Sequence, residues 1–438
     1  IDRGLVGSEM CIRDRSMVRQ LIHGKNFFKD EFGVDVDNLW LPDVFGYSAA
    51  LPQILKKSGI NYFLTQKLSW SQFNEFPHQT FHWRGIDGTE ILTHFPPENT
   101  YNSELDTQFL LPAQTGFKEK DKLDEFISLF GVGDGGGGPK PENIELGMRM
   151  GNLENSPRVS FDTAKNFFYR LENKKHCLDT WVGELYLELH RGTLTTHGLV
   201  KKQNRKLEWK LRAVEMLWSC IEMDKYPAVE LDKLWKKLLI NQFHDIIPGS
   251  SINLVYQTTY KEYEEIHHGC DNLIDQSSKI LFEEDKNSFV LMNTLSYTWS
   301  GMINVPDSFH GYSIIDEEGK AVPTHKVGEK IEAFVSLKPL SFSTFKKGKE
   351  NKLDHSVQST PVLENDLIKY EFNDQGHMIS AFDKELGREV LKSPGNILSL
   401  YEDRPNNWDA WDIDFFYRGA LQETCLLYTS DAADDQAC

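Results

Sequence analysis

Between residues 38 and 65 the apolar pattern changes from strand to helix and back to strand, which leaves few folds open to this part of the chain. Short apolar segments at Asn38–Leu41 and Tyr62–Thr65 flank a helical pattern at Ala49–Lys57. Two strands joined by a helix over so few residues form a parallel βαβ unit. The pattern therefore predicts an open parallel sheet, whose ligand crevice lies at the carboxyl ends of its strands.

The predicted α/β domain extends over residues 16–188. A helix is expected at Met17–Phe32 and another over residues 160–172, because apolar residues recur there at helical spacing. Asp87-Gly88 separates two apolar segments, Phe81–Arg84 and Glu90–Phe95. An Asp-Gly pair between such segments predicts a β-hairpin.

The rest of the chain divides into a helical part and a strand-rich part. Residues 189–284 have a helical period throughout, with apolar stripes at 207–218 and 231–239, and predict a three-helix bundle. Residues 285–424 consist of short strand patterns separated by turn signals, including a hairpin around 367–382, and predict the beginning of a β-sandwich. The polar segment Lys346–Thr360 is expected to be a loop of that domain. The predicted fold class is therefore α/β, then α, then β.

The two ends differ from the sequence between them. Leu5–Arg15 reads LVGSEMCIRDR, and the last fourteen residues read CLLYTSDAADDQAC. Both resemble the translated arms of a transposase sequencing adapter, so we interpret residues 1–15 and 425–438 as non-native. The alternative is a pair of natural disordered tails. Under the first interpretation the protein extends beyond both ends.

Charge and cysteine usage limit the partners. With 66 acidic and 48 basic residues, the net charge is −18, which opposes binding to a phosphate backbone, so nucleic acid is not expected as a partner. No apolar run is long enough to span a membrane. The six cysteines lack CxxC spacing, and there is no glycosylation acceptor. A cytoplasmic protein is therefore expected, with a homo-oligomer left open.

The nonapeptide WLPDVFGYS, residues 40–48, places Asp43 directly after the first predicted strand. A carboxylate at this edge of the sheet is a candidate catalytic group. By itself, Asp43 is also typical of a helix N-cap. Phe45 and Tyr47 are candidates for an aromatic wall against the apolar face of a sugar.

His244 and Asp245 lie in NQFHD, which is predicted to close a helix that Pro248-Gly249 terminates. Imidazole and carboxylate are ordinary zinc ligands. A histidine in a last helical turn is also typical of a partner of the helix dipole. Asp245 is a candidate both for orienting the site and for capping the turn.

Asp134 stands in GDGGGGP, residues 133–139. Since no Gly-Lys-Ser/Thr follows, the loop is not a P-loop. Glycines beside a carboxylate allow the backbone to approach a ligand closely. Alternatively, the segment is a flexible surface loop.

Several ordered blocks, together with those above, resemble glycoside hydrolase family 38 α-mannosidases of the cytosolic-type branch. The resemblance covers residues 16–424. The further blocks are TQKLSW at 65–70, FHWRGIDGTEILTHFPP at 81–97, ELYLELHRGTLTT at 184–196, LEND at 363–366 and DRPNNWDAWDID at 403–414.

The resemblance implies a zinc-dependent retaining hydrolase of terminal α-mannosyl units in oligosaccharides. It implies that Asp43 is nucleophile and zinc ligand, that His244 is a zinc ligand, and that Asp134 is the candidate acid/base. Other branches of the family have a pair of aspartates at the place of Asp134 and the residue after it, whereas this chain has Gly135 at the second of these positions. Residues expected to bind substrate are Phe45, Lys67, Tyr101, His190, Arg191 and Asp245, with Thr193 as a further candidate. Lys67 is expected near the acid, and Trp408, Asp409, Trp411 and Asp412 are expected at a domain contact near the site.

The family's zinc has two more ligands in a His-x-Asp segment, and no such segment precedes Asp43. The chain alone is therefore expected to lack part of the metal site, together with the first strand of the sheet, and to be inactive. Three rival interpretations stay open: a hydrolase of another sugar, a non-catalytic carbohydrate-binding protein, and a phosphosugar or nucleotide enzyme.

Overall fold

The computed structural model of the protein describes residues 11–350 and 361–425. The predicted adapter segments lie mostly outside these residues. The chain divides into two compact units, one made of residues 1–212, 227–271 and 405–413, the other of residues 213–226, 272–404 and 414–438. Each unit is described separately below.

The first unit is built on a five-stranded sheet with the order β1-β2-β4-β3-β5. Strands β1, β2 and β4 are parallel, β3 is antiparallel to β4, and β5 is parallel to β3. The predicted βαβ unit and hairpin are thus both confirmed, but the sheet is mixed, because the hairpin reverses the direction of β3. The strand bounds are β1 Asn38–Trp40, β2 Tyr62–Leu64, β3 Thr80–Arg84, β4 Glu90–His94 and β5 Thr180–Val182.

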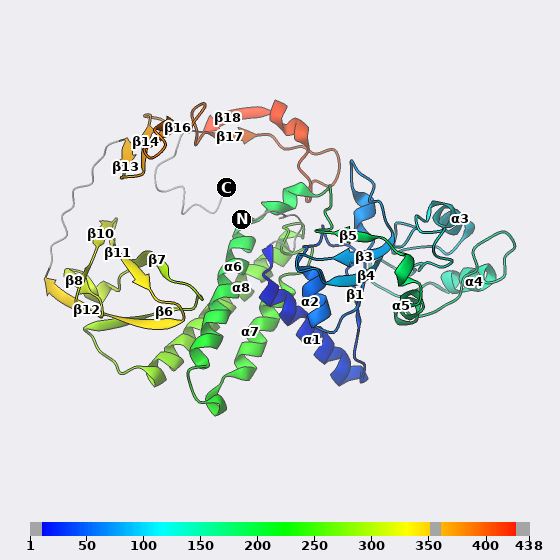
Figure 1. The fold of residues 1–438 in the computed structure, drawn as a ribbon, viewed down its shortest axis with the longest axis horizontal. Coiled ribbons are helices and arrows are strands. Elements are labelled where there is room, and N and C mark those ends of the chain that lie inside the picture. The colour runs from blue at the N-terminus through cyan, green and yellow to red at the C-terminus, as the bar shows by residue number, and fades with distance from the viewer. Residues whose placement is uncertain (1–10, 351–360, 426–438) are drawn as a thin grey trace. The chain divides into compact units, whose positions relative to one another are not determined.

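Helices cover both faces of this sheet (Figure 1). In β2, the side chain of Phe63 packs with residues of α1 and α2, while Tyr62 and Leu64 pack with residues of α5. This division follows from the alternation of side chains along a strand. The helix bounds are α1 Asp14–Phe32, α2 Leu51–Lys57, α3 Thr107–Gly116, α4 Pro141–Met150 and α5 Ala164–Glu172.

Three further helices follow: α6 Gly198–Trp218, α7 Ala228–Ile240 and α8 Asn253–Leu281. The predicted apolar stripes are buried, with Leu207, Leu211 and Leu238 fully inaccessible. Helix α7 ends at Ile240, earlier than predicted, because the Asn241 side chain donates a hydrogen bond to the carbonyl of Lys237 and the chain then turns. His244 therefore lies in a turn and not in the helix.

The second unit contains the strands from β6 onward. The sheets β10-β11-β7 and β6-β12-β8-β9 share one apolar core, as expected of a sandwich. Along β11, alternate residues are buried, as the period of a half-buried strand requires. Two smaller sheets, β13-β14-β15-β16 and β17-β18, follow.

The bounds of these strands are β6 Ser288–Asn293, β7 Trp299–Asn304, β8 Tyr312–Ile315, β9 Ala321–Val322, β10 Thr324–Val327, β11 Lys330–Leu337, β12 Ser341–Glu350, β13 Val362–Glu364, β14 Ile368–Phe372, β15 Met378–Asp383, β16 Arg388–Glu389, β17 Leu398–Tyr401 and β18 Leu421–Cys425. The hairpin predicted around 367–382 is confirmed as β14 and β15. The prediction of a loop at Lys346–Thr360 is wrong for its first five residues, which extend β12 and pair with β6 and β8. They can do so because backbone pairing tolerates lysine and glutamate on an exposed face. Residues 351–360 lie outside the described part.

Among the described helices, none combines the length and the apolar character that a bilayer crossing needs.

Candidate functional site

Asp43 follows the carboxyl end of β1, where the chain leaves the sheet. It does not cap α2, which begins at Leu51 after Ala50. Its Oδ1 accepts a hydrogen bond of 2.6 Å from Nζ of Lys67, and its Oδ2 lies 3.9 Å from Nε2 of His244. The carboxylate is thus held between a cation and an imidazole.

Lys67 follows the carboxyl end of the neighbouring strand β2, in the short 3₁₀ helix η2, Lys67–Trp70. Only 3% of the residue is exposed. Burial of an ammonium group is costly unless it is paired, and Asp43 supplies the pair. Nζ also lies 5.1 Å from the ring centroid of Phe45 and 4.5 Å from that of Trp70. Lys67 was expected near the candidate acid, Asp134. The structure places its ammonium group against the candidate nucleophile, Asp43.

His244 and Asp245 come from the turn after α7. Nε2 of His244 lies 3.5 Å from Oδ2 of Asp245. Burial lowers the pKa of His244, against the opposing effects of the Asp245 and Asp43 charges. A neutral imidazole has a free lone pair, as a metal ligand requires. The contacts of Asp245 are compatible with both of its candidate roles, since its Oδ1 also accepts a 2.7 Å hydrogen bond from the Ser250 hydroxyl within the turn.

Tyr101 and Asp134 come from loops after β4. The Tyr101 hydroxyl donates a 2.9 Å hydrogen bond to Oδ1 of Asp134. Burial, with the nearby charge of Asp43, raises the pKa of Tyr101 far above its ordinary value, so the hydroxyl stays a donor. A Cβ atom on Gly133 would lie 2.5 Å from atoms of Tyr101 and Asn102. Glycine at 133 therefore permits the contact, whereas Asp134 itself is exposed.

A segment far along the chain, residues 405–413, completes the site; we call it the strap. Oδ2 of Asp412 lies 3.1 Å from Nδ1 of His190, and both side chains are at least nine-tenths buried. Nε1 of Trp411 donates a 3.2 Å hydrogen bond to Oδ1 of Asp245. The strap thus contacts His190 and Asp245. The Phe45 ring lies 4.9 Å from that of His190 and 6.2 Å from that of His244.

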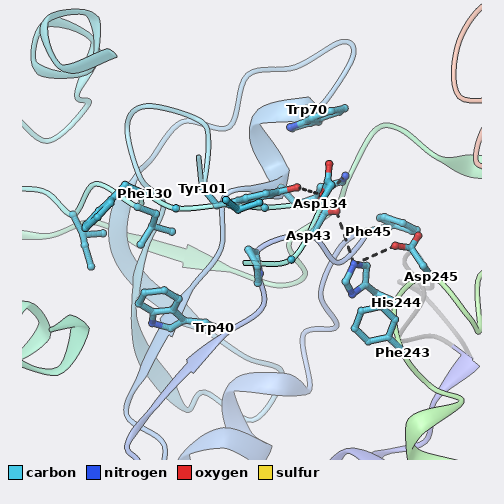
Figure 2. Close-up of a pocket in the computed structure, with 18 of the residues that line it drawn as sticks. Trp40, Asp43, Phe45, Trp70, Tyr101, Phe130, Asp134, Phe243, His244 and Asp245 are labelled. Atoms are coloured by element: carbon cyan, nitrogen blue, oxygen red, sulfur yellow. Dashed lines mark hydrogen bonds and ion pairs between the residues drawn. The ribbon is translucent and has the colours of Figure 1, made fainter. Parts of the chain in front are cut away.

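Most of these groups line one cavity of about 920 Å³, although Asp412 does not. Figure 2 shows Asp43, Asp134, His244 and Asp245 converging in it, with Trp70 and Tyr101 beside the carboxylates and Trp40 and Phe130 further away. A cleft of this size, apolar with few convergent polar groups, is typical of a small-molecule site. Three carboxylates and a buried lysine in such a cleft are suited to acid–base and nucleophilic chemistry.

Most of the predicted site residues line the cavity: Asp43, Phe45, Lys67, Tyr101, Asp134, His190, His244, Asp245, Trp408 and Trp411. Tyr47 does not. It is fully buried, and its hydroxyl donates to the carbonyl of Leu41, so it is a core residue and not part of an aromatic wall. Arg191 points elsewhere, with its guanidinium 5.7 Å from the Phe73 ring. The Thr193 hydroxyl is occupied by the carbonyl of His190.

Sequence reasoning missed some residues. Trp40 and Trp70 line the cavity but were not predicted to. Both were visible as signals, because Trp40 begins the block WLPDVFGYS and Trp70 ends the block TQKLSW. Asn204 and Glu208 were also missed: both accept hydrogen bonds from the Gln242 side chain, and Glu208 accepts one from the Ser16 hydroxyl as well. Their signal was weak, because polar residues on a helix usually face solvent.

The donors present fit a divalent metal only in part. Asp43 and His244 are a carboxylate and a neutral imidazole facing each other, which is the donor chemistry of zinc. Within residues 11–350 and 361–425, however, no group of three or more histidine, cysteine, aspartate or glutamate side chains is arranged to hold an ion. Two ligands are fewer than the three that a catalytic zinc normally has.

Comparison with known proteins supports a common origin. Residues 8–184 match the family described as Glycosyl hydrolases family 38 N-terminal domain, residues 188–281 the Alpha mannosidase middle domain, and residues 363–424 the Glycosyl hydrolases family 38 C-terminal domain. The crystal structure of an alpha-mannosidase from Enterococcus faecalis V583 has a similar fold, with a TM-score of 0.69 and 19% identity over 92% of this chain and 53% of that chain.

Two curated relatives are similar along most of the chain. Alpha-mannosidase G of Dictyostelium discoideum is 36% identical over 94% of this chain and 42% of that protein. Alpha-mannosidase 2C1 of Homo sapiens is 36% identical over 91% of this chain and 38% of that protein. The chain thus spans about two fifths of the length of these relatives. Its residues thus match the N-terminal domain of glycosyl hydrolase family 38, the alpha mannosidase middle domain and the C-terminal domain of family 38, in that order.

Proposed function

We propose that the full-length protein containing this chain hydrolyses terminal α-mannosyl units of oligosaccharides with retention of configuration. One observation carries the proposal: a single cavity brings together Asp43, Asp134 and His244 from three distant segments of a family 38 chain. The names of the relatives, all alpha-mannosidases, support the choice of sugar.

Asp43 is the nucleophile of the proposed reaction. Its carboxylate attacks the anomeric carbon, forming a carbon–oxygen bond as the bond to the leaving oxygen breaks. The ion pair with Lys67 supports this role, because the 2.6 Å hydrogen bond from Nζ fixes the position of the carboxylate that attacks. Phe45 packs beside it and restricts the position of the sugar.

Asp134 is the acid/base of the proposed reaction. It gives its proton to the departing oxygen and then takes one from the water that hydrolyses the covalent intermediate. Two inversions at the same carbon leave the configuration unchanged. The Tyr101 hydroxyl, which donates to Asp134, holds the carboxyl group in place through both steps.

We further propose that Asp43 and His244 hold a divalent metal, zinc being the best match to their donor atoms. When bound, the metal would orient and polarise sugar hydroxyls. Because the described residues offer only two such donors, the full-length protein has to supply the others. The chain expressed alone is then expected to be inactive.

A cytoplasmic location and free mannose-containing oligosaccharides as substrates belong to the same proposal. Among the described residues outside the predicted adapter segments, Cys177, Cys220 and Cys270 all have free thiols, as a reducing compartment favours.

The test is an assay of the full-length protein on an aryl α-mannoside, with and without a chelator. Asp43→Asn is expected to lower kcat by more than about a thousandfold, the scale seen when a nucleophile is lost. Asp409→Asn is the matched control, because this strap carboxylate is exposed and does not line the cavity.

Each outcome is informative. Activity that the chelator abolishes, that zinc restores and that Asp43→Asn lacks supports the whole proposal. Activity indifferent to the chelator contradicts the metal. Tight mannoside binding without turnover, unchanged by Asp43→Asn, favours a carbohydrate-binding protein instead, and turnover of a different glycoside favours a related hydrolase.

A further inference from the structure

Two tryptophans at one end of the cavity expose large apolar faces. Trp70, from η2, is 39% exposed, and Trp408, from the strap, is 49% exposed. Their ring centroids are 5.6 Å apart and their planes are inclined at 55°. Both indoles line the cavity that contains Asp43 and Asp134. Two large apolar rings left open inside a cleft indicate a surface that a ligand covers.

The two indoles are held in place by their surroundings. Nζ of Lys67, itself paired with Asp43, lies 4.5 Å from the Trp70 ring centroid. Trp408 has a φ of 58°, a conformation that is rare outside glycine. Its carbonyl accepts hydrogen bonds of 2.8 Å from the backbone of Trp411 and of Asp412, which close the strap into a turn. A backbone strained in this way persists only where the surrounding structure fixes it.

The strap is itself fixed to the catalytic unit. A Cβ atom on Gly192 would lie 2.9 Å from the carbonyl oxygen of Trp411, so the strap packs directly on that backbone. Asp412 is bound to His190, and Trp411 to Asp245. Trp408 is therefore presented to the cavity from a rigid support, although it lies more than three hundred residues from Trp70 in the chain.

The chemistry of this end of the cavity selects the ligand. Exposed indole faces bind flat apolar surfaces, such as a nucleobase or the C–H face of a sugar ring. The carboxylates of Asp43, Asp134 and Asp245, with a net charge of −18 on the protein, oppose a phosphate-bearing ligand. A neutral sugar ring remains. Figure 2 shows Trp70 next to Asp134, the group that would protonate a leaving oxygen.

We propose that Trp70 and Trp408 form a platform for the second sugar of the substrate, the one released as the leaving group. The proposal rests on the proposed function, because a leaving group exists only if the chain belongs to a glycosidase. It assigns the strap a role in selecting substrates: an oligosaccharide covers both indoles, whereas a mannoside with a small leaving group covers neither.

The experiment compares two substrates in the full-length protein. One is the best-cleaved of the α-linked mannobioses, whose second sugar reaches the platform. The other is α-mannosyl fluoride, whose leaving group is one atom. Trp408→Ala is expected to lower kcat/KM for the mannobiose about 3- to 10-fold, the scale of one aromatic contact, and to change that for the fluoride less than about twofold. Trp408→Phe is expected to retain part of the preference.

Phe415→Ala is the matched control, because this aromatic residue lies just beyond the strap, is 80% exposed and does not line the cavity. It is expected to leave both substrates unaffected. Equal losses on both substrates in Trp408→Ala would overturn the platform and make Trp408 a support of the catalytic centre. No loss on either would overturn it as well.

Failure of the proposed function has a different signature. If the wild-type protein cleaves neither substrate, the glycosidase proposal fails and the platform is tested by binding instead. A saturable change of indole fluorescence on titration with mannobiose, weaker with mannose and lost in Trp408→Ala, then supports a sugar platform. No change with either sugar overturns it.

Discussion

At Gly133, an added Cβ atom would lie 2.5 Å from atoms of Tyr101 and of Asn102. Real Cβ atoms essentially never show that distance, so any other residue at 133 would displace the side chains of Tyr101 and Asn102, and with Tyr101 the hydrogen bond that its hydroxyl donates to Asp134. Two positions further, at Gly135, the nearest atom to an added Cβ is 3.6 Å away on Val132, which is ordinary contact. Neighbouring glycines in one run thus have different requirements.

Gly133→Ala is therefore expected to lower kcat/KM of the full-length protein on an aryl α-mannoside by about 10- to 100-fold, the cost of displacing a catalytic group by about 1 Å. Gly135→Ala is expected to stay within about twofold of the wild type. Equal effects of the two substitutions, at equal melting temperature, would show that Asp134 is not positioned through Gly133.

Another residue-scale expectation concerns the buried charge of Lys67. Lys67→Met keeps the length of the side chain but leaves Asp43 without its cation and removes the charge over Phe45. We expect at least a tenfold loss of kcat, because the hydrogen bond from Nζ to Oδ1 of Asp43 holds the attacking carboxylate in position. Lys67→Arg, which keeps the charge, should recover part of the activity. If Lys67→Met matched the wild type, the ion pair would have no catalytic role.

Among the elements, β4 ends in a histidine that ties the sheet to a loop at the site. His94 is fully buried, and burial lowers its pKa to about 3. The backbone N–H of Ile127 donates to Nε2 at 3.4 Å, and Nδ1 lies 2.8 Å from Oγ1 of Thr80. With Nε2 as acceptor, Nδ1 carries the proton and donates to the threonine. A neutral ring satisfies both partners, whereas a protonated ring would lose one.

The pH dependence of stability follows from this burial. The unfolded chain binds a proton at His94 below about pH 6.5, whereas the folded chain does so only near pH 3, so acid favours unfolding throughout that window. The free energy of unfolding is expected to fall by up to about 1.4 kcal/mol per pH unit from this residue. Urea titrations at pH 7, 6 and 5 should show a smaller decrease in His94→Gln.

His325→Gln is the control for this experiment, because the His325 side chain is 58% exposed. It should keep the decrease seen in the wild type. If His94→Gln kept it as well, the decrease would have to come from other groups, such as the carboxylates.

In the whole molecule, the cavity depends on segments that are distant in sequence. Within the described part of the chain, Asp43 and His244 are two donors, fewer than a catalytic metal normally has. Mass action provides a test that needs no turnover, because a ligand that binds only the folded state raises the melting temperature. In the full-length protein, zinc at about a hundredfold excess over its Kd is expected to raise the Tm of the transition that unfolds the metal-binding domain by about 5 °C, the shift for a domain of up to about 250 residues.

His244→Ala should abolish most of that rise, and the chain expressed alone should show little of it. His268→Ala serves as the control, since this histidine lies outside the cavity. A rise of equal size in the isolated chain would mean that Asp43 and His244 hold the metal without further ligands.

Much of the fold followed from local pattern. The βαβ unit and the hairpin were predicted within a few residues of their bounds, and the three helices of the bundle were predicted as a group, because apolar periodicity reflects which face is buried. The end of α7 and the strand β12 were not. Asn241 ends α7 through a hydrogen bond from its side chain to the carbonyl of Lys237. Strand β12 continues through polar residues because its backbone pairs with β6 and β8. Neither effect is visible in the periodicity.

The sequence by itself determined which residue types stand at the ends of the parallel strands and in the turn after α7, and therefore which groups were candidates for the site. Only the tertiary structure decided that Lys67 pairs with Asp43 and that Trp408 lies beside Trp70. It also decided that Tyr47 belongs to the core. The physical reason is that local pattern reports burial and hydrogen bonding within an element, whereas these contacts join segments tens to hundreds of residues apart, whose meeting depends on the packing of the whole unit.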